Sequence, residues 1–265
     1  MPDVMQHADL PHGTIRFMVE GPSDGPPILL IHPLGVSLEF WDGLAGALRD
    51  RFRVIRFDLR GHGPNGGPAG DYTIEDLGSD ALAVLAAAGV STAHVVGISI
   101  GGLVTMWMGV HARAQVRSLF IAQSAARVGT VERWEERRAL VRERGVGAVA
   151  ELAMGTWFTP EFVQSHPGEA NRCRQMIAAC PSAGYLGCCA VLRDTDLRSA
   201  LPGITAPTLV LAGERDPSTP RADADLIVAA IPGARLKTLN SAHMSAIELA
   251  DDFRNLVVDW VDSAT

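Results

Sequence analysis

The sequence Ala93-His-Val-Val-Gly-Ile-Ser-Ile-Gly-Gly-Leu103 contains a short apolar run, a Gly-x-Ser-x-Gly pattern centred on Ser99, and the start of a second apolar segment. We expect a strand over residues 93–97 and a buried helix over residues 100–111, which are apolar almost all round. A serine at a sharp turn between a strand and a helix exposes its oxygen above the sheet edge, an arrangement called a nucleophile elbow. The pattern alone also fits a glycine-rich turn with an ordinary serine, so its position between strand and helix carries the prediction.

Further apolar runs, mostly rich in Val, Leu and Ile and bounded by Gly, Pro or Asp, predict the rest of a sheet. They span residues 14–20, 27–32, 52–58, 116–122, 207–212 and 235–239. Such runs are typical of a parallel sheet that is covered on both faces. Helical patterns lie between them, including one at 73–88 that opens with a capping-box pattern. Alternating strands and helices predict an α/β fold with a doubly wound, mostly parallel sheet.

Residues 125–196 interrupt this alternation. They show no convincing strand, are rich in Arg, Glu and Ala, and contain Trp134 and Trp157. We interpret them as a helical cap inserted after the sixth strand, with residues 1–124 and 197–265 forming the core. A second independent domain is the weaker interpretation, because about 70 residues of mixed polarity make a poor separate core.

The turn at Ser99 predicts a nucleophile that needs a partner, since a serine hydroxyl is weakly reactive at neutral pH without an adjacent base. For a nucleophile elbow the expected chain order is Ser, then an acid, then His. Asp216 follows the predicted strand 207–212, and His243 follows 235–239. Both therefore lie beyond the carboxyl ends of strands, where a doubly wound fold places its site. We predict that His243 acts as general base and then general acid, and that Asp216 orients its imidazole.

Four other residues compete for these roles. Glu214 and Asp196 are alternative acids, although Glu214 lies two residues nearer the strand and should point elsewhere. His94 precedes a strand, at the wrong end for the site, and His62 lies in a turn. We expect both histidines to be structural.

Acyl transfer also requires donors for the oxyanion. The backbone N–H of Ile100, the residue after the serine, is the first expected donor. The second should come from the loop His32-Pro-Leu-Gly35, here called loop 32–35. Proline has no N–H to donate, so we predict Leu34 as the second donor. A simple tight turn is the alternative interpretation of this loop.

Cofactor and metal signals are weak. Residues 61–66 fit Gly-x-Gly-x-x-Gly after a strand, but Pro64 and the Gly-Gly-Pro-Ala-Gly that follows should prevent the helix that a dinucleotide fingerprint needs. The eight histidines form no HxH or HExxH pair. We therefore expect no nicotinamide, flavin or metal, and no cofactor.

Composition limits the other classes of function. The 265 residues are 47% hydrophobic, and the net charge of −7 argues against nucleic acid or anionic membrane as partners. Four cysteines lie within residues 173–189 without a CxxC pair, as expected for buried, reduced thiols. The first ten residues lack a signal pattern, and no apolar run reaches the ~18 residues of a membrane span. We expect a soluble cytoplasmic protein; its oligomeric state stays open, a homo-oligomer included.

Several segments resemble a known family. They are Asp58–Gly63, Tyr72–Leu77, Ile231–Ala234, Ala242–Glu248 and, within the cap, Tyr185–Leu197. Over nearly its whole length the chain resembles an α/β-hydrolase, and within that group it is most similar to 3-oxoadipate enol-lactonases. The resemblance implies hydrolysis of an enol-lactone in aromatic catabolism, without cofactor, under a cap that shapes the substrate pocket.

The resemblance also points to candidate substrate contacts in the cap. Trp134 is the best one by position, with a core tryptophan between cap helices as the alternative. Arg138 and Arg193 could meet a substrate carboxylate, since arginine offers a bidentate fork, and surface salt bridges are their alternative role. Loop 32–35 replaces a serine-rich stretch that we expect in lactonases, and Ala246 stands where asparagine is preferred. These departures flank the pocket and leave room for another lactone or ester.

The function we predict is therefore a serine hydrolase that cleaves a small carboxylate-bearing lactone or ester. A carboxylesterase, carbon–carbon bond hydrolase, perhydrolase or biosynthetic cyclase with the same machinery is the main alternative. A non-catalytic ligand-binding protein of the same fold is a minor one, because fold does not dictate function.

Overall fold

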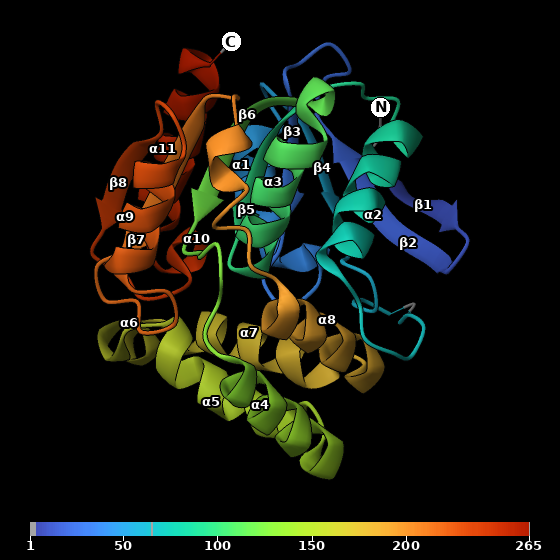
Figure 1. Cartoon of the computed structure of the whole chain (residues 1–265), viewed down its shortest axis with the longest axis vertical. Coiled ribbons are helices and arrows are strands. Elements are labelled where there is room, and N and C mark those ends of the chain that lie inside the picture. The colour runs from blue at the N-terminus through green and yellow to red at the C-terminus, as the bar shows by residue number, and fades with distance from the viewer. Residues whose placement is uncertain (1–3, 65, 265) are drawn as a thin grey trace.

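The computed structural model describes residues 4–64 and 66–264 and is built around one twisted eight-stranded sheet (Figure 1). The strand order across the sheet is β1-β2-β4-β3-β5-β6-β7-β8. β1 and β2 pair antiparallel, as do β2 and β4, and all other pairs are parallel. The strands are β1 (Val4–Leu10), β2 (Gly13–Glu20), β3 (Pro27–Ile31), β4 (Arg53–Phe57), β5 (Ala93–Ile98), β6 (Val116–Ala122), β7 (Thr208–Gly213) and β8 (Arg235–Leu239).

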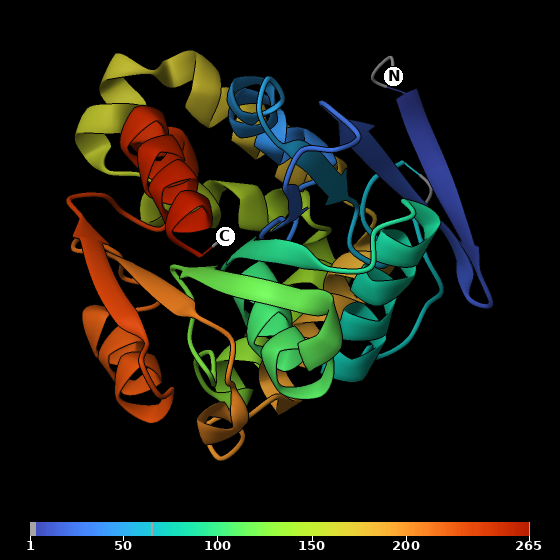
Figure 2. The ribbon, with the colours of Figure 1, turned by 90° about the horizontal axis from the view of Figure 1, so that it is seen from above.

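Helices cover both faces of this sheet (Figure 2). α1 (Asp42–Leu48) and α11 (Ala250–Ser263) lie on one face. α2 (Ile74–Ala87), α3 (Ile100–His111) and α9 (Arg221–Ala230) lie on the other. Because both faces are covered, all residues of β5 and β7 are buried, as continuous apolar runs predict. The predicted doubly wound, mostly parallel α/β sheet is confirmed.

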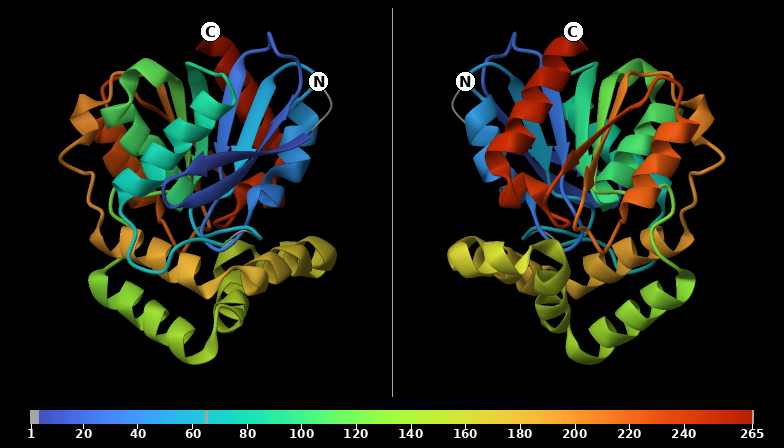
Figure 3. Two further views of the ribbon diagram at one scale, coloured as in Figure 1. Left: turned by 90° about the vertical axis from the view of Figure 1, so that its right-hand side faces the viewer. Right: turned by 90° about the vertical axis from the view of Figure 1, so that its left-hand side faces the viewer.

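Five helices between β6 and β7 form a layer across one end of the sheet (Figure 3). They are α4 (Val131–Arg144), α5 (Gly147–Trp157), α6 (Pro160–Ser165), α7 (Pro167–Ala179) and α8 (Ser182–Asp194). The predicted helical insertion after the sixth strand is confirmed. We call α4–α8 and their connecting residues the cap.

Local sequence signals account for most element boundaries. α2 begins after Thr73, whose side chain accepts from the Asp76 N–H while Asp76 accepts from the Thr73 N–H, a complete capping box. The glycine pattern at residues 61–66 is followed by no helix before Ile74, so the described residues there do not form a dinucleotide-binding turn. The N-terminal strand β1 was not predicted, and it pairs along its whole length with β2.

The four cysteines are buried and free, as expected. Burial raises the pKa of Cys173 to about 11 and that of Cys180 and Cys189 to about 12. These thiols are therefore protonated at neutral pH and weakly reactive. Among the residues described, no single helix is long and apolar enough to cross a bilayer, although α7 and α8 reach that length and composition as a pair bent by 97°.

Candidate active site

Ser99 stands on a strained turn between β5 and α3. Its backbone φ is 59° and ψ is −121°, in a region that non-glycine residues rarely occupy. The turn is held from the neighbouring strand: the Ser99 N–H donates to the Ala122 carbonyl at 3.0 Å, and the Ser124 hydroxyl donates to the Ser99 carbonyl at 2.7 Å. These two hydrogen bonds hold the backbone of Ser99 in its strained conformation and keep its side chain above the end of the sheet.

Two glycines make this turn sterically feasible. A Cβ at Gly97 would lie 2.2 Å from the Gly101 carbonyl oxygen, and a Cβ at Gly101 would lie 2.2 Å from that of Ile31. Real Cβ atoms do not approach backbone oxygens so closely. The Gly-x-Ser-x-Gly pattern is therefore required by packing between β3, β5 and α3.

Three side chains that are distant in sequence form one hydrogen-bonded chain. The Ser99 hydroxyl lies 3.0 Å from His243 Nε2, and His243 Nδ1 lies 2.7 Å from Asp216 Oδ2. With the proton on Nδ1, the imidazole donates to the carboxylate and accepts from the serine hydroxyl. His243 is 3% exposed, whereas Ser99 is only half-buried and open to an incoming ligand. The structure thus brings together the three residues predicted as nucleophile, base and orienting acid.

Asp216 is held as an acceptor. Its Oδ1 accepts from the N–H groups of Ser218 and Thr219 at 2.7 and 3.1 Å, and its Oδ2 accepts from the Thr219 hydroxyl at 2.7 Å. Burial alone would raise the pKa of Asp216, but the charge and hydrogen bond of His243 and these donors outweigh it. The pKa of Asp216 consequently lies below its ordinary value.

The two predicted oxyanion donors belong to segments next to the serine. Ile100 is the first residue of α3, and the first N–H groups of a helix have no partner within it. Leu34 is 8% exposed and lines the same cavity as Ser99 and His243. Loop 32–35 follows β3, which pairs parallel with β5, so it begins at the same end of the sheet as the turn at Ser99.

Two buried histidines hold loop 32–35. The Gly35 N–H donates to His62 Nε2 at 3.0 Å, and the Leu59 N–H donates to His32 Nε2 at 3.0 Å. His32 Nδ1 donates to the Pro33 carbonyl at 2.7 Å. Burial lowers the pKa of His32 to about 4 and that of His62 to about 3, so both are neutral near pH 7 and can accept these bonds.

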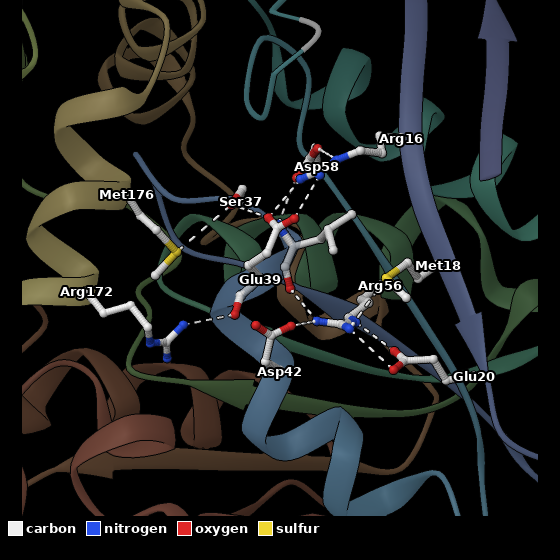
Figure 4. Close-up of polar contacts among 11 residues, drawn as sticks. Arg16, Met18, Glu20, Ser37, Glu39, Asp42, Arg56, Asp58, Arg172 and Met176 are labelled. Carbon is white, nitrogen blue, oxygen red and sulfur yellow. Dashed lines mark hydrogen bonds and ion pairs between the residues drawn. The ribbon is translucent and has the colours of Figure 1, made fainter. Parts of the chain in front are cut away.

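A cluster of charged side chains fixes residues 38 and 39, which follow this loop (Figure 4). The Leu38 N–H donates to Asp58 Oδ1 at 2.7 Å, and Arg16 Nε donates to Asp58 Oδ2 at 2.6 Å. Arg16 also pairs with Glu39 at 2.7 Å. From the cap, Arg172 of α7 donates to the Glu39 backbone carbonyl at 3.1 Å. The segment is therefore tied to the sheet on one side and to the cap on the other.

A cavity lies above Ser99 and beneath the cap. Its floor is formed by Ser99, His243 and Leu34. Its wall combines apolar and aromatic side chains with polar ones. The first group is Trp134, Trp157, Tyr185, Val128, Ala153, Ile177 and Leu192, and the second includes Arg133, Arg137, Thr156, Ser218 and Thr219. A serine hydroxyl at the base of a cavity with aromatic walls and converging polar side chains is typical of an enzyme site for a small organic substrate that carries polar groups.

The sequence model of the family described as alpha/beta hydrolase fold matches residues 26–249. The chain belongs to this family. The hydrolase is 33% identical over 243 residues to 3-oxoadipate enol-lactonase 2 of Acinetobacter baylyi, covering 92% of the hydrolase and 91% of the relative. It is 31% identical over 250 residues to 3-oxoadipate enol-lactonase 1 of the same organism, covering 94% of each.

Solved structures agree with this placement. The enol-lactonase from Burkholderia xenovorans LB400 superposes on the hydrolase with a TM-score of 0.94 at 32% identity, covering 97% of the hydrolase and all of the other chain. A thermophilic esterase from Thermogutta terrifontis, solved with malate bound, superposes with a TM-score of 0.90 at 26% identity and covers 100% and 99% of the two chains. The predicted resemblance to α/β-hydrolases, and within them to enol-lactonases, is confirmed.

Trp134 of the hydrolase lines the cavity, and its contact with a substrate stays a prediction. It is 7% exposed, and its Nε1 donates to the Val128 carbonyl at 2.6 Å, which fixes the indole. Two arginines on the same helix were missed: Arg133 and Arg137 also line the cavity. Arg137 donates to the Tyr185 hydroxyl at 3.4 Å, and neither arginine forms an ion pair with any residue that the structure describes. Their spacing of four residues on α4 was the available signal, since it puts both on one side of the helix.

Arg138 and Arg193 lie outside the cavity lining, so the structure does not support the predicted contact of either with a substrate. Both point to an acidic cluster: Arg138 pairs with Asp71 and with Glu135 (2.9 Å), and Arg193 pairs with Glu135 and with Asp71 (2.9 Å). Asp71 lies in the loop before α2, so these pairs link the cap to the core. The salt-bridge role that the sequence left open is the one the structure displays.

The competing residues lie away from His243. Glu214 accepts from the Thr238 hydroxyl at 2.9 Å, and Asp196 pairs with Arg198 at 2.6 Å near the surface. His94 Nδ1 forms a hydrogen bond with the Ser118 hydroxyl at 2.8 Å. The two residues lie near the amino ends of β5 and β6, at the opposite end of the sheet from Ser99. Within residues 4–64 and 66–264, no group of three or more His, Cys, Asp or Glu side chains is arranged to hold a metal ion.

Proposed function

We propose that the protein hydrolyses a small carboxylate-bearing lactone, of the 3-oxoadipate enol-lactone type, through an acyl-enzyme at Ser99. The observation that carries the proposal is the hydrogen-bonded chain from Ser99 through His243 to Asp216, at the base of a cavity roofed by the cap. The names of the A. baylyi and B. xenovorans relatives support the lactone as substrate class.

In the first step, Ser99 Oγ forms a bond to the lactone carbonyl carbon while His243 Nε2 takes the hydroxyl proton. Asp216 stabilises the imidazolium that results and keeps Nδ1 protonated. The negative charge that develops on the carbonyl oxygen is stabilised by the N–H groups of Ile100 and Leu34. These donors act best in the transition state, where the oxygen carries most charge.

Collapse of this intermediate breaks the ring C–O bond. His243 returns its proton to the leaving oxygen, which remains tethered to the acyl-enzyme because the substrate is cyclic. An enol leaving group then tautomerises to a ketone, which removes the nucleophile for the reverse reaction. A water molecule, deprotonated by His243, attacks the acyl carbon; the bond to Ser99 breaks, Ser99 regains its proton, and an open-chain keto acid leaves.

The charge of the cavity wall supports a substrate with a carboxylate. Arg133 and Arg137 face the cavity and have no acidic partner among the described residues. A guanidinium binds a carboxylate through two parallel hydrogen bonds, which fixes orientation as well as charge. Trp134, between them in sequence, offers a flat apolar surface for the lactone ring. We assign substrate orientation to these three residues.

The test is steady-state kinetics on a panel that contains the enol-lactone, neutral aryl esters and a vinylogous diketone. We expect kcat/KM to be highest for the enol-lactone, and Ser99→Ala to lower kcat by roughly 10³–10⁶-fold with the fold intact. Fluorophosphonate labelling of Ser99 is a second measurement. Preference for a neutral ester or for the diketone would refute the substrate class, and near-normal turnover by Ser99→Ala would refute the nucleophile.

A further inference from the structure

The loop that carries His243 is joined directly to the cap. Met244, the next residue, donates its N–H to the Trp157 carbonyl at 3.0 Å. Trp157 ends α5, and its side chain lines the cavity above Ser99. One backbone hydrogen bond therefore links the wall of the cavity to the residue that follows the imidazole.

Glu248 reinforces this junction from the core side. It is the last residue of α10 (Ser245–Glu248), and its side chain folds back toward the His243 loop. Oε2 accepts from the Ala242 N–H at 2.8 Å, on the residue that precedes His243. Oε1 accepts from the Thr159 N–H at 3.1 Å and from the Thr159 hydroxyl. Both carboxylate oxygens are used, one on each side of the junction.

The chemistry of these contacts selects a carboxylate. All three partners of Glu248 are donors, and an ionised carboxylate only accepts, so every bond is satisfied. A glutamine of the same shape would keep one acceptor oxygen but would turn an NH₂ group toward an N–H. Thr159 is itself held, because it is 6% exposed and caps α6 by accepting from the Phe162 N–H at 3.4 Å.

We propose that Glu248 is a positioning residue that sets His243 against Ser99 by locking the histidine loop to the cap at Thr159. The proposal rests on the proposed serine chemistry. Because the same carboxylate braces the segment that carries Trp157, the position of the cap and the reactivity of the base are coupled. Loosening the junction lowers the rate of attack by Ser99 on any acyl group, including one too small to fill the cavity.

A second link between cap and core gives the control. Glu161 of α6 pairs with Arg215 of the core at 3.1 Å, and both side chains are exposed. Glu161→Gln makes the same chemical change as Glu248→Gln. It lies four residues after Trp157, on the cap side of the junction, and does not change the His243 loop. Thr159→Val removes the hydroxyl that donates to Glu248, together with its cap on α6, and tests the junction from the cap side.

The experiment measures the second-order rate of Ser99 labelling by a fluorophosphonate, and kcat and KM for p-nitrophenyl acetate, in the full-length protein. We expect Glu248→Gln to lower the labelling rate and the kcat for p-nitrophenyl acetate about tenfold, with KM little changed. Thr159→Val should have a smaller effect, and the double variant should be no slower than Glu248→Gln, because both changes break one junction. Glu161→Gln should match the wild type.

The outcomes separate this proposal from the lactonase assignment. Wild-type labelling and kcat in a folded Glu248→Gln variant would overturn it, since a merely structural role changes only the melting temperature. An effect confined to KM for large substrates would overturn it too, because it would place Glu248 in cap stability alone. If Glu248→Gln does not fold, wild-type labelling by a folded Thr159→Val variant would overturn the proposal instead, because that change removes one of the bonds to the same carboxylate. A wild type that labels normally but ignores lactones would refute only the substrate.

Discussion

Lowering the pH from about 7 to about 4 should destabilise the protein, because His32 and His62 are buried as neutral imidazoles. Burial lowers the pKa of His32 to about 4 and that of His62 to about 3, against about 6.5 in an unfolded chain. Between these values the unfolded chain binds a proton at each position and the folded protein does not. The free energy of unfolding therefore falls as the pH falls from about 6.5 toward 4.

The magnitude follows from the size of the shifts. At pH 4 each of the two histidines should reduce the free energy of unfolding by about 3 kcal/mol, or about 6 kcal/mol together. Domains are usually stable by about 5–15 kcal/mol, so this loss is a large fraction of the total. His94, whose pKa burial lowers to about 4, acts in the same direction.

The assay is urea unfolding followed by tryptophan fluorescence at a series of pH values. His62→Gln is the informative variant, because an amide oxygen can accept from the Gly35 N–H without titrating. Between about pH 5.5 and 4, the free energy of unfolding of this variant should fall less steeply than that of the wild type. The two slopes should differ by about 1.4 kcal/mol per pH unit, the contribution of one histidine. His7→Gln, at an exposed position on β1, is the control and should follow the wild type. Equal slopes for His62→Gln and wild type, or a flat wild-type curve, would refute the reasoning.

Three further substitutions test the site. Asp216→Asn should lower kcat about 10⁴-fold without unfolding the protein, because an amide does not hold the Nδ1–H tautomer of His243; a kcat near wild type would contradict this. Gly97→Ala should lower stability in thermal unfolding by about 3 kcal/mol or more, since the new Cβ would lie 2.2 Å from the Gly101 carbonyl oxygen, and an unchanged melting temperature would count against the packing argument. Arg137→Ala should raise KM for a carboxylate-bearing lactone about tenfold and leave a neutral ester nearly unaffected. Arg142→Ala, exposed on the same helix, is its control, and an equal KM for the two variants would contradict the assignment.

The parts of the fold that the sequence predicted are those with a local signal. Apolar runs bounded by turn residues located seven of the strands, and Ser99 between a strand and a helix located the elbow. Asp216 and His243 followed from topology, because residues after neighbouring parallel strands meet at one edge. β1 was not predicted because it is an edge strand in which Gln6, His7 and Asp9 interrupt the apolar residues. Its pairing with β2 is what makes it a strand.

Substrate contacts in the cap were harder to predict because tertiary partners decide them. Residues 133–138 contain three arginines within about one and a half helical turns, and helical spacing alone does not say which one meets the cavity. Arg138 turns away because Asp71, 67 residues distant in sequence, pairs with it. Glu248 likewise stands close to His243 in sequence, but its partner Thr159 is 89 residues away.

The close packing of backbone around Ser99 has a consequence for laboratory evolution. A side chain at Gly97 or Gly101 would collide with a backbone carbonyl oxygen, so saturation libraries at these positions should yield mostly unfolded clones. The cap wall, built from side chains such as Trp134 and Ile177, can vary without disturbing that backbone. Selection for new substrates should therefore accumulate changes in the cap while the turn beneath it stays invariant.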